Sequence, residues 1–172
     1  MLKYLFLLLH LAALPAMAAP APQALFYLST EAKSVQSFLA HADQVDVVAP
    51  HWYGVDSKGA LTGEPNPQVM AAAKKHGVLV TPLVTNHGFV QEDVHELLMH
   101  PETHPALFAA LIRTAKKHGY AGFQLDLEHV PSGDRDALTA FVRAAAAALH
   151  AEKLLVSIAT VPNASIMKKE TG

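Results

Sequence analysis

The 172-residue chain contains no cysteine. It therefore cannot form a disulfide, carry a lipid on an N-terminal cysteine or use a thiol as a nucleophile. The chain also lacks a surplus of positive charge, because 13 lysines and arginines face 15 acidic residues, and this balance argues against a nucleic-acid partner. The remaining composition, 51% hydrophobic and 16% charged, is that of an ordinary folded protein of one domain.

Several motifs of cofactor binding and catalysis are also missing. No G-x-G-x-x-G or G-x-x-x-x-G-K-[ST] follows an apolar run, and no G-x-S-x-G marks a serine nucleophile. The 11 histidines form no H-E-x-x-H or other tight ligand spacing. Three of them, His95, His100 and His104, lie in a polar helix or loop segment, where we expect exposed side chains. The sequence therefore predicts neither a metal nor a cofactor.

The N-terminal residues have the pattern of an export signal. Lys3 precedes an apolar run at 5–14, and Ala-Met-Ala at 16–18 is a small-x-small cleavage pattern. The run is shorter than the roughly 20 apolar residues that a membrane span needs, and Pro15 ends it. A membrane anchor is thus the weaker alternative. We expect residues 1–19 to be a signal peptide, and the mature protein to be secreted or periplasmic, with no membrane contact.

Apolar runs alternate with helical patterns from residue 24 onward. Strands are expected at 24–29, 45–50, 78–85, 121–127 and 154–160, and helices around 35–39, at 67–76, at 105–118 and from about 134 to 151. Two helices end in the same sequence, AKKHG, which places basic residues at the negative end of the helix dipole and a glycine as C-cap. Nearly continuous apolar strands between helices are typical of a parallel sheet covered by helices.

Two α/β folds fit this order, an open doubly wound sheet and a (β/α)8 barrel of the TIM type. Both place functional residues at the carboxyl ends of the strands. Because the glycine-rich phosphate loops of the open sheet are absent, the barrel is preferred. A complete barrel typically takes about 250 residues, whereas this chain supplies about five β/α units. We therefore expect an incomplete barrel with exposed sheet edges and marginal stability.

Two acidic residues stand at the end of the fourth expected strand. Asp126 and Glu128 are spaced two apart, and alternate side chains of a strand face the same side, so the two carboxylates would project together. The negative charge of Asp126 would make ionisation of Glu128 harder and raise the pKa of Glu128 toward the range in which a carboxylic acid can donate a proton near neutral pH. The alternative is a strand end whose acids cap the next helix or merely contact water.

The segment that carries these acids, GYAGFQLDLEHV at 119–130, resembles the motif D-G-x-D-x-D-x-E of glycoside hydrolase family 18. It is most similar to the spore-germination and peptidoglycan-lytic branch, in which Gly-Tyr-x-Gly-x-x-x-Asp-x-Glu is common. Residues 45–63 also resemble the second strand and following hairpin of that branch. The resemblance implies that residues 20–172 are the N-terminal part of a chitinase-like β/α barrel whose fourth strand carries the catalytic acid.

This resemblance further implies a glycoside hydrolase that cleaves β-1,4-linked N-acetylglucosamine polymers, either chitin or the peptidoglycan glycan. Glu128 would be the general acid/base. Asp126 would orient the N-acetyl group of the substrate, whose oxygen attacks the anomeric carbon in substrate-assisted retaining catalysis. The outer acids of the family motif fall at Ala121 and Gln124 here, and a truncated chain could be inactive alone. The alternative is a non-catalytic, chitinase-like sugar-binding protein.

Four further residues are expected at the substrate. Gln124 shares a strand face with Asp126 and could hydrogen-bond to it. Trp52 and Tyr53 follow the second strand, where aromatic rings could stack on a sugar, and plain packing is an equal alternative. Asn86 follows the third strand and could line the same opening, with a solvated loop as its alternative.

Overall fold

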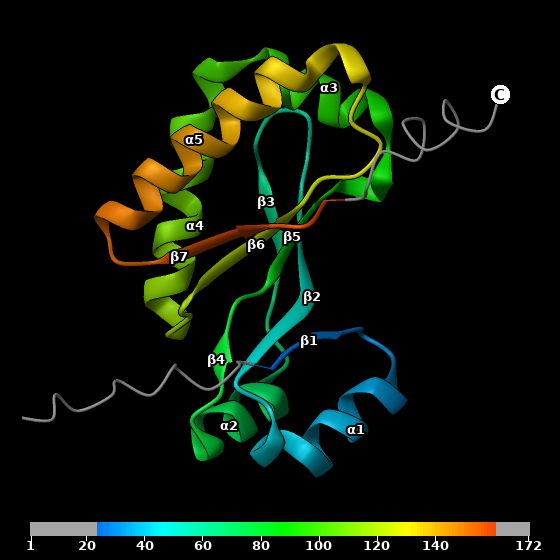
Figure 1. The fold of residues 1–172 in the computed structure, drawn as a ribbon, viewed down its shortest axis with the longest axis vertical. Coiled ribbons are helices and arrows are strands. Elements are labelled where there is room, and N and C mark those ends of the chain that lie inside the picture. The colour runs from blue at the N-terminus through cyan, green and yellow to red at the C-terminus, as the bar shows by residue number, and fades with distance from the viewer. Residues whose placement is uncertain (1–23, 161–172) are drawn as a thin grey trace, which may run out of the picture.

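The computed structural model describes residues 24–160, so the expected signal peptide lies outside the described residues and stays a prediction (Figure 1). The strands are β1 (Leu25–Leu28), β2 (Val47–Val55), β3 (Leu61–Gly63), β4 (Leu79–Val80), β5 (Leu83–Asn86), β6 (Gly122–Asp126) and β7 (Leu155–Ile158). They form one sheet, in which β1, β2, β5, β6 and β7 lie in that order and every neighbouring pair is parallel. The shorter β4 pairs with β2 in parallel, and β3 pairs with β2 in antiparallel orientation. The predicted α/β fold, an incomplete barrel of five units, is confirmed.

Five helices and four short 3-10 turns connect these strands. They are α1 (Ala32–His41), α2 (Pro67–His76), α3 (Gln91–Met99), α4 (His104–His118), α5 (Arg135–Ala151), η1 (Ala42–Gln44), η2 (His87–Phe89), η3 (Pro101–Thr103) and η4 (Ser132–Asp134). In Figure 1, α1 and α2 lie together near β1 and β4, whereas α4 and α5 lie along β6 and β7. Phe123 and Leu125 of β6 share one buried core with Phe141 of α5. None of the helices in the described part is long and apolar enough to cross a membrane.

The helix boundaries follow from local chemistry. The Asn66 side chain caps α2 by accepting hydrogen bonds from the backbone N–H groups of Gln68 and Val69, at 2.9 and 3.3 Å. At their other ends, α2 and α4 stop at Gly77 and Gly119, which have φ of 72° and 74°. Glycine adopts this left-handed conformation without a steric cost. Both helix ends predicted from AKKHG are confirmed.

A long-range hydrogen bond shows that the sheet is curved. The side-chain amide of Gln124 in β6 donates to the hydroxyl of Tyr27 in β1. Two strands, β2 and β5, lie between them in the sheet. Three strand intervals of about 4.8 Å would separate the two strands by about 14 Å in a flat sheet. The sheet therefore curls around the face that carries Tyr27 and Gln124, as in part of a barrel.

Three elements differ from the expectations. Strand β2 continues beyond Pro50 to Val55, because its second half pairs with β3 and β5 instead of β1. The third expected strand is interrupted between β4 and β5 at Pro82, which has no N–H to donate to a neighbour. The segment before α4 forms the separate helix α3, which buries Val94, Leu97 and Leu98.

Gly122, the first residue of β6, is required by the close approach of β7. A Cβ atom at this position would lie 2.0 Å from the backbone oxygen of Leu155. We expect Gly122→Ala to lower the free energy of unfolding by about 3 kcal/mol, because the two strand backbones would have to separate. Urea denaturation would measure this loss. Gly133→Ala is the matched control, since a Cβ there meets no atom within 4 Å, and equal midpoints for the two variants would contradict the prediction.

Candidate active site

Asp126 is the last residue of β6, beside Thr85 of β5 in the parallel register. Its side chain is half-buried. Burial raises the pKa of Asp126 above its ordinary value of 3.8, the negative charge of Glu128 raises it further, and His51 acts in the opposite direction. The raised pKa thus falls on Asp126, whereas it was expected for Glu128 from the sequence.

Glu128 lies two residues beyond the end of β6, because the strand is shorter than expected. Its backbone N–H donates a hydrogen bond of 2.8 Å to Oδ1 of Asn86, at the end of the neighbouring strand. The Glu128 side chain is 48% exposed, and its Oε2 lies 3.9 Å from Nε2 of His129. This carboxyl group is accessible from solvent, as a proton donor to a bound substrate must be.

His51, which acts on the pKa of Asp126, was not among the site residues expected from the sequence. His51 of β2 is exposed, and its Nε2 lies 3.4 Å from Oγ1 of the buried Thr85. The imidazole ring also lies 5.9 Å from the ring of Phe89, measured between centroids. His51 was missed because the second strand was expected to end at Pro50. The register shift between His51 and Tyr53 interrupts the period-2 alternation of β2, so no regular strand pattern indicated His51.

Two of the four expected substrate residues have buried side chains whose polar groups face the protein. Gln124 is 5% exposed, and its amide donates to Tyr27 and makes no hydrogen bond with Asp126, contrary to the expectation. The reason is the curvature of the sheet, which brings Tyr27 within reach. Asn86 is 1% exposed, and its Nδ2 donates to the backbone oxygen of Val90 at 3.1 Å. The side chain of Asn86 is thus hydrogen-bonded to two backbone groups, the N–H of Glu128 and the oxygen of Val90.

The two aromatic residues after Pro50 pack against other rings. Tyr53 is 3% exposed, and its hydroxyl lies 2.9 Å from the hydroxyl of Tyr120. The half-buried ring of Trp52 lies 6.2 Å from that of Tyr120, and Tyr53 also contacts Phe123 edge-on. For Tyr53 the structure corresponds to the packing alternative, while part of Trp52 reaches solvent.

Two hollows lie away from the carboxyl pair. One, of about 430 Å³, lies between β1 and α1, and the other, of about 450 Å³, lies among α3, α4 and α5. Neither is lined by Asp126 or Glu128. Within residues 24–160, no group of three or more histidine, aspartate or glutamate side chains could hold a metal ion. The candidate site is therefore separate from both of these hollows.

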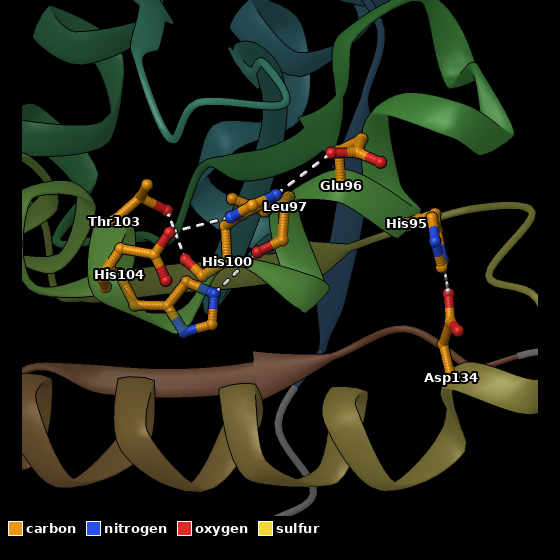
Figure 2. A network of polar contacts seen from close by, with 8 residues as sticks. His95, Glu96, Leu97, His100, Thr103, His104 and Asp134 are labelled. Carbon is orange, nitrogen blue, oxygen red and sulfur yellow. Dashed lines mark hydrogen bonds and ion pairs between the residues drawn. The ribbon is translucent and has the colours of Figure 1, made fainter.

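Figure 2 shows the polar contacts of the three histidines in the polar segment. Nδ1 of His95 lies 2.7 Å from Oδ2 of Asp134, and His100 lies between two glutamates. His104 was expected on the surface, but it is 6% exposed and donates to the backbone oxygen of Leu97 at 2.7 Å. The expectation was wrong because the His104 ring packs edge-on against Phe141 of α5.

Comparison with known proteins supports the fold. The fold is similar to the spore cortex-lytic enzyme SleL from Bacillus megaterium QM B1551, with a TM-score of 0.76 and 23% identity over 82% of this chain and 35% of that chain. It is also similar to a class V chitininase from Pseudomonas fluorescens Pf-5, with a TM-score of 0.75 and 26% identity over 83% of this chain and 45% of that chain.

A curated relative is the putative sporulation-specific glycosylase YdhD from Bacillus subtilis, 34% identical over 85 residues, which are 46% of this chain and 20% of YdhD. The chain spans less than half the length of these relatives. The motif led us to expect family 18, whereas the family model that matches, over residues 27–161, is that of glycosyl hydrolase family 85. Since this match covers most of the sequence, the chain belongs to glycosyl hydrolase family 85.

Proposed function

We propose that this chain carries the acid/base residues of a glycoside hydrolase that cleaves β-1,4-linked N-acetylglucosamine glycans, either chitin or the glycan of peptidoglycan. The observation that carries the proposal is the pair Asp126 and Glu128. Asp126 ends the inner parallel strand β6, Glu128 follows two residues later, and the charge of Glu128 contributes to the raised pKa of Asp126. The carboxyl ends of the strands are where enzymes with β/α barrels place their catalytic groups.

In the proposed reaction, the exposed carboxyl group of Glu128 donates its proton to the glycosidic oxygen, and the leaving sugar departs as an alcohol. The acetamido oxygen of the substrate forms a bond to the anomeric carbon as the glycosidic bond breaks. Asp126 accepts a hydrogen bond from the acetamido N–H and stabilises the positive charge that develops. Glu128 then removes a proton from a water molecule, which attacks the same carbon and restores the original configuration.

The similar proteins support this substrate class. One is described as a spore cortex-lytic enzyme, one as a class V chitininase and one as a putative glycosylase. A second candidate function, sugar binding without catalysis, is favoured by a single observation, the alanine at position 121 where the family 18 motif has an acid.

Turnover and stereochemistry test the proposal together. We expect the purified chain to release reducing ends from N-acetylglucosamine oligosaccharides, and proton NMR of the first product to show the β anomer, because substrate-assisted cleavage retains configuration. An α anomer as first product would contradict the role of the acetamido group. Calorimetric binding of the oligosaccharide without release of reducing ends would favour the sugar-binding alternative over the hydrolase.

A further inference from the structure

Glu128 belongs to a loop that side chains of a neighbouring segment contact at three points. We call residues 127–134, between β6 and α5, the Glu128 loop, and residues 86–95, from the end of β5 into α3, the anchor segment. Three side chains of the anchor segment contact the Glu128 loop, and these are Asn86, Gln91 and His95. Two contacts fall at residues 128 and 129, near the start of the loop, and the third falls at residue 134, at its end.

The contact made by Asn86 is the one nearest to the proposed proton donor. Its Oδ1 accepts the backbone N–H of Glu128 at 2.8 Å, and its Nδ2 donates to the backbone oxygen of Val90 at 3.1 Å. Both partners are backbone groups, whose polarity cannot change. If the amide were flipped, its NH2 group would face the Glu128 N–H and its oxygen would face the Val90 oxygen. Only the observed orientation therefore satisfies both hydrogen bonds. Because Asn86 is 1% exposed, water cannot replace it without rearrangement.

The other two contacts hold the chain immediately after Glu128. Nε2 of Gln91 donates to the backbone oxygen of His129 at 3.1 Å. His129 has φ of 58°, a left-handed conformation that is uncommon for a residue with a side chain. Such a conformation persists where surrounding contacts determine it. Figure 2 shows the third contact, in which His95 of α3 points toward Asp134 at the end of the loop.

We propose that Asn86 is a positioning residue for Glu128: it fixes the backbone from which the proton donor projects and does not itself contact the sugar. The inference rests on the proposed function and assigns Asn86 a role other than the substrate contact expected from the sequence. Displacing a catalytic group by about 1 Å can lower the rate by about 100-fold. The buried amide of Asn86 is the group that prevents such a displacement.

The test compares two asparagines that each accept backbone N–H groups. Asn86→Ala is expected to lower kcat on N-acetylglucosamine oligosaccharides by about 10- to 100-fold, with KM changed by less than about twofold. Asn66→Ala, which removes the cap of α2, is the matched control, and we expect its kcat to stay near that of the unmodified chain. Hydrogen exchange, followed by NMR, should show slow exchange of the Glu128 amide in the unmodified chain and fast exchange in Asn86→Ala.

Each outcome decides the proposal. An unchanged kcat in Asn86→Ala, or a change in KM alone, would overturn it, as would fast exchange of the Glu128 amide in the unmodified chain. If Asn86→Ala does not fold, Asn86→Asp replaces it, because a carboxylate still accepts the Glu128 N–H. Its Glu128 amide should stay protected, and loss of that protection would contradict the proposal. If Glu128→Gln keeps full activity, the proposed function fails, whereas loss of activity in Glu128→Gln beside an unaffected Asn86→Ala defeats this inference alone.

Discussion

Replacing Glu128 with glutamine is expected to lower the turnover of N-acetylglucosamine oligosaccharides by about 10²- to 10⁴-fold, the usual contribution of a positioned general acid. Glutamine keeps the shape of the side chain but cannot donate a proton to the glycosidic oxygen. The Glu128 side chain is 48% exposed, and the hydrogen bond to Asn86 uses its backbone N–H. The substitution should therefore leave the fold unchanged, and rates measured as release of reducing ends should report on proton transfer.

Glu152→Gln is the matched control for this substitution. Glu152→Gln also removes a carboxylate. In the unmodified chain the Glu152 carboxylate, near the end of α5, pairs with Lys116 at 2.6 Å. Both side chains of that pair are exposed, so the pair contributes about 1 kcal/mol or less to stability. We expect turnover by Glu152→Gln to match that of the unmodified chain. Full activity in Glu128→Gln would rule out Glu128 as the proton donor.

The second large effect is expected for Asp126→Asn, in two opposite directions. Turnover should fall on the order of 10²-fold, because an amide cannot stabilise the positive charge that develops on the substrate. The free energy of unfolding near pH 7 should rise. Burial and the charge of Glu128 raise the pKa of Asp126 in the folded chain above its ordinary value of 3.8. Between these two pKa values the folded state binds more protons than the unfolded state, so stability falls as the pH rises.

Thermal unfolding at two pH values measures this effect. Asparagine resembles the protonated aspartic acid, so the gain of Asp126→Asn should be present near pH 7 and should vanish below the ordinary pKa of 3.8, where the acid is protonated in both states. Asp136→Asn, a substitution in the first turn of α5, serves as the comparison and should not gain stability near pH 7. A lower melting temperature for Asp126→Asn near pH 7 would contradict the electrostatic picture of the site.

Local sequence signals were sufficient for the features that depend on neighbours in the chain. The cap at Asn66 and the glycines at 77 and 119 predicted helix ends, because capping involves residues within one turn. The apolar runs likewise predicted the five parallel strands, because each run is a property of consecutive residues. The position of Asp126 at a strand end followed from one of these runs.

The features that depend on contacts between distant segments could not be predicted. Asn86 and Glu128 are 42 residues apart, and Tyr27 and Gln124 are 97 residues apart. No periodicity in the sequence reports such pairs, so the hydrogen bond between Asn86 and the backbone of Glu128 could not be predicted. Local pattern also misjudged His104, because a polar residue at a helix start is usually exposed and only the packing of α4 against α5 buries it.

A crystal structure of the Glu128→Gln variant with a bound N-acetylglucosamine oligosaccharide would test the central claim most directly. We predict that the acetamido nitrogen lies within about 3.2 Å of the Asp126 carboxylate, and that the glycosidic oxygen lies within the same distance of the side chain at position 128. A sugar bound away from β6, or side chains at 126 and 128 that face opposite sides of the sheet, would contradict the proposed active site.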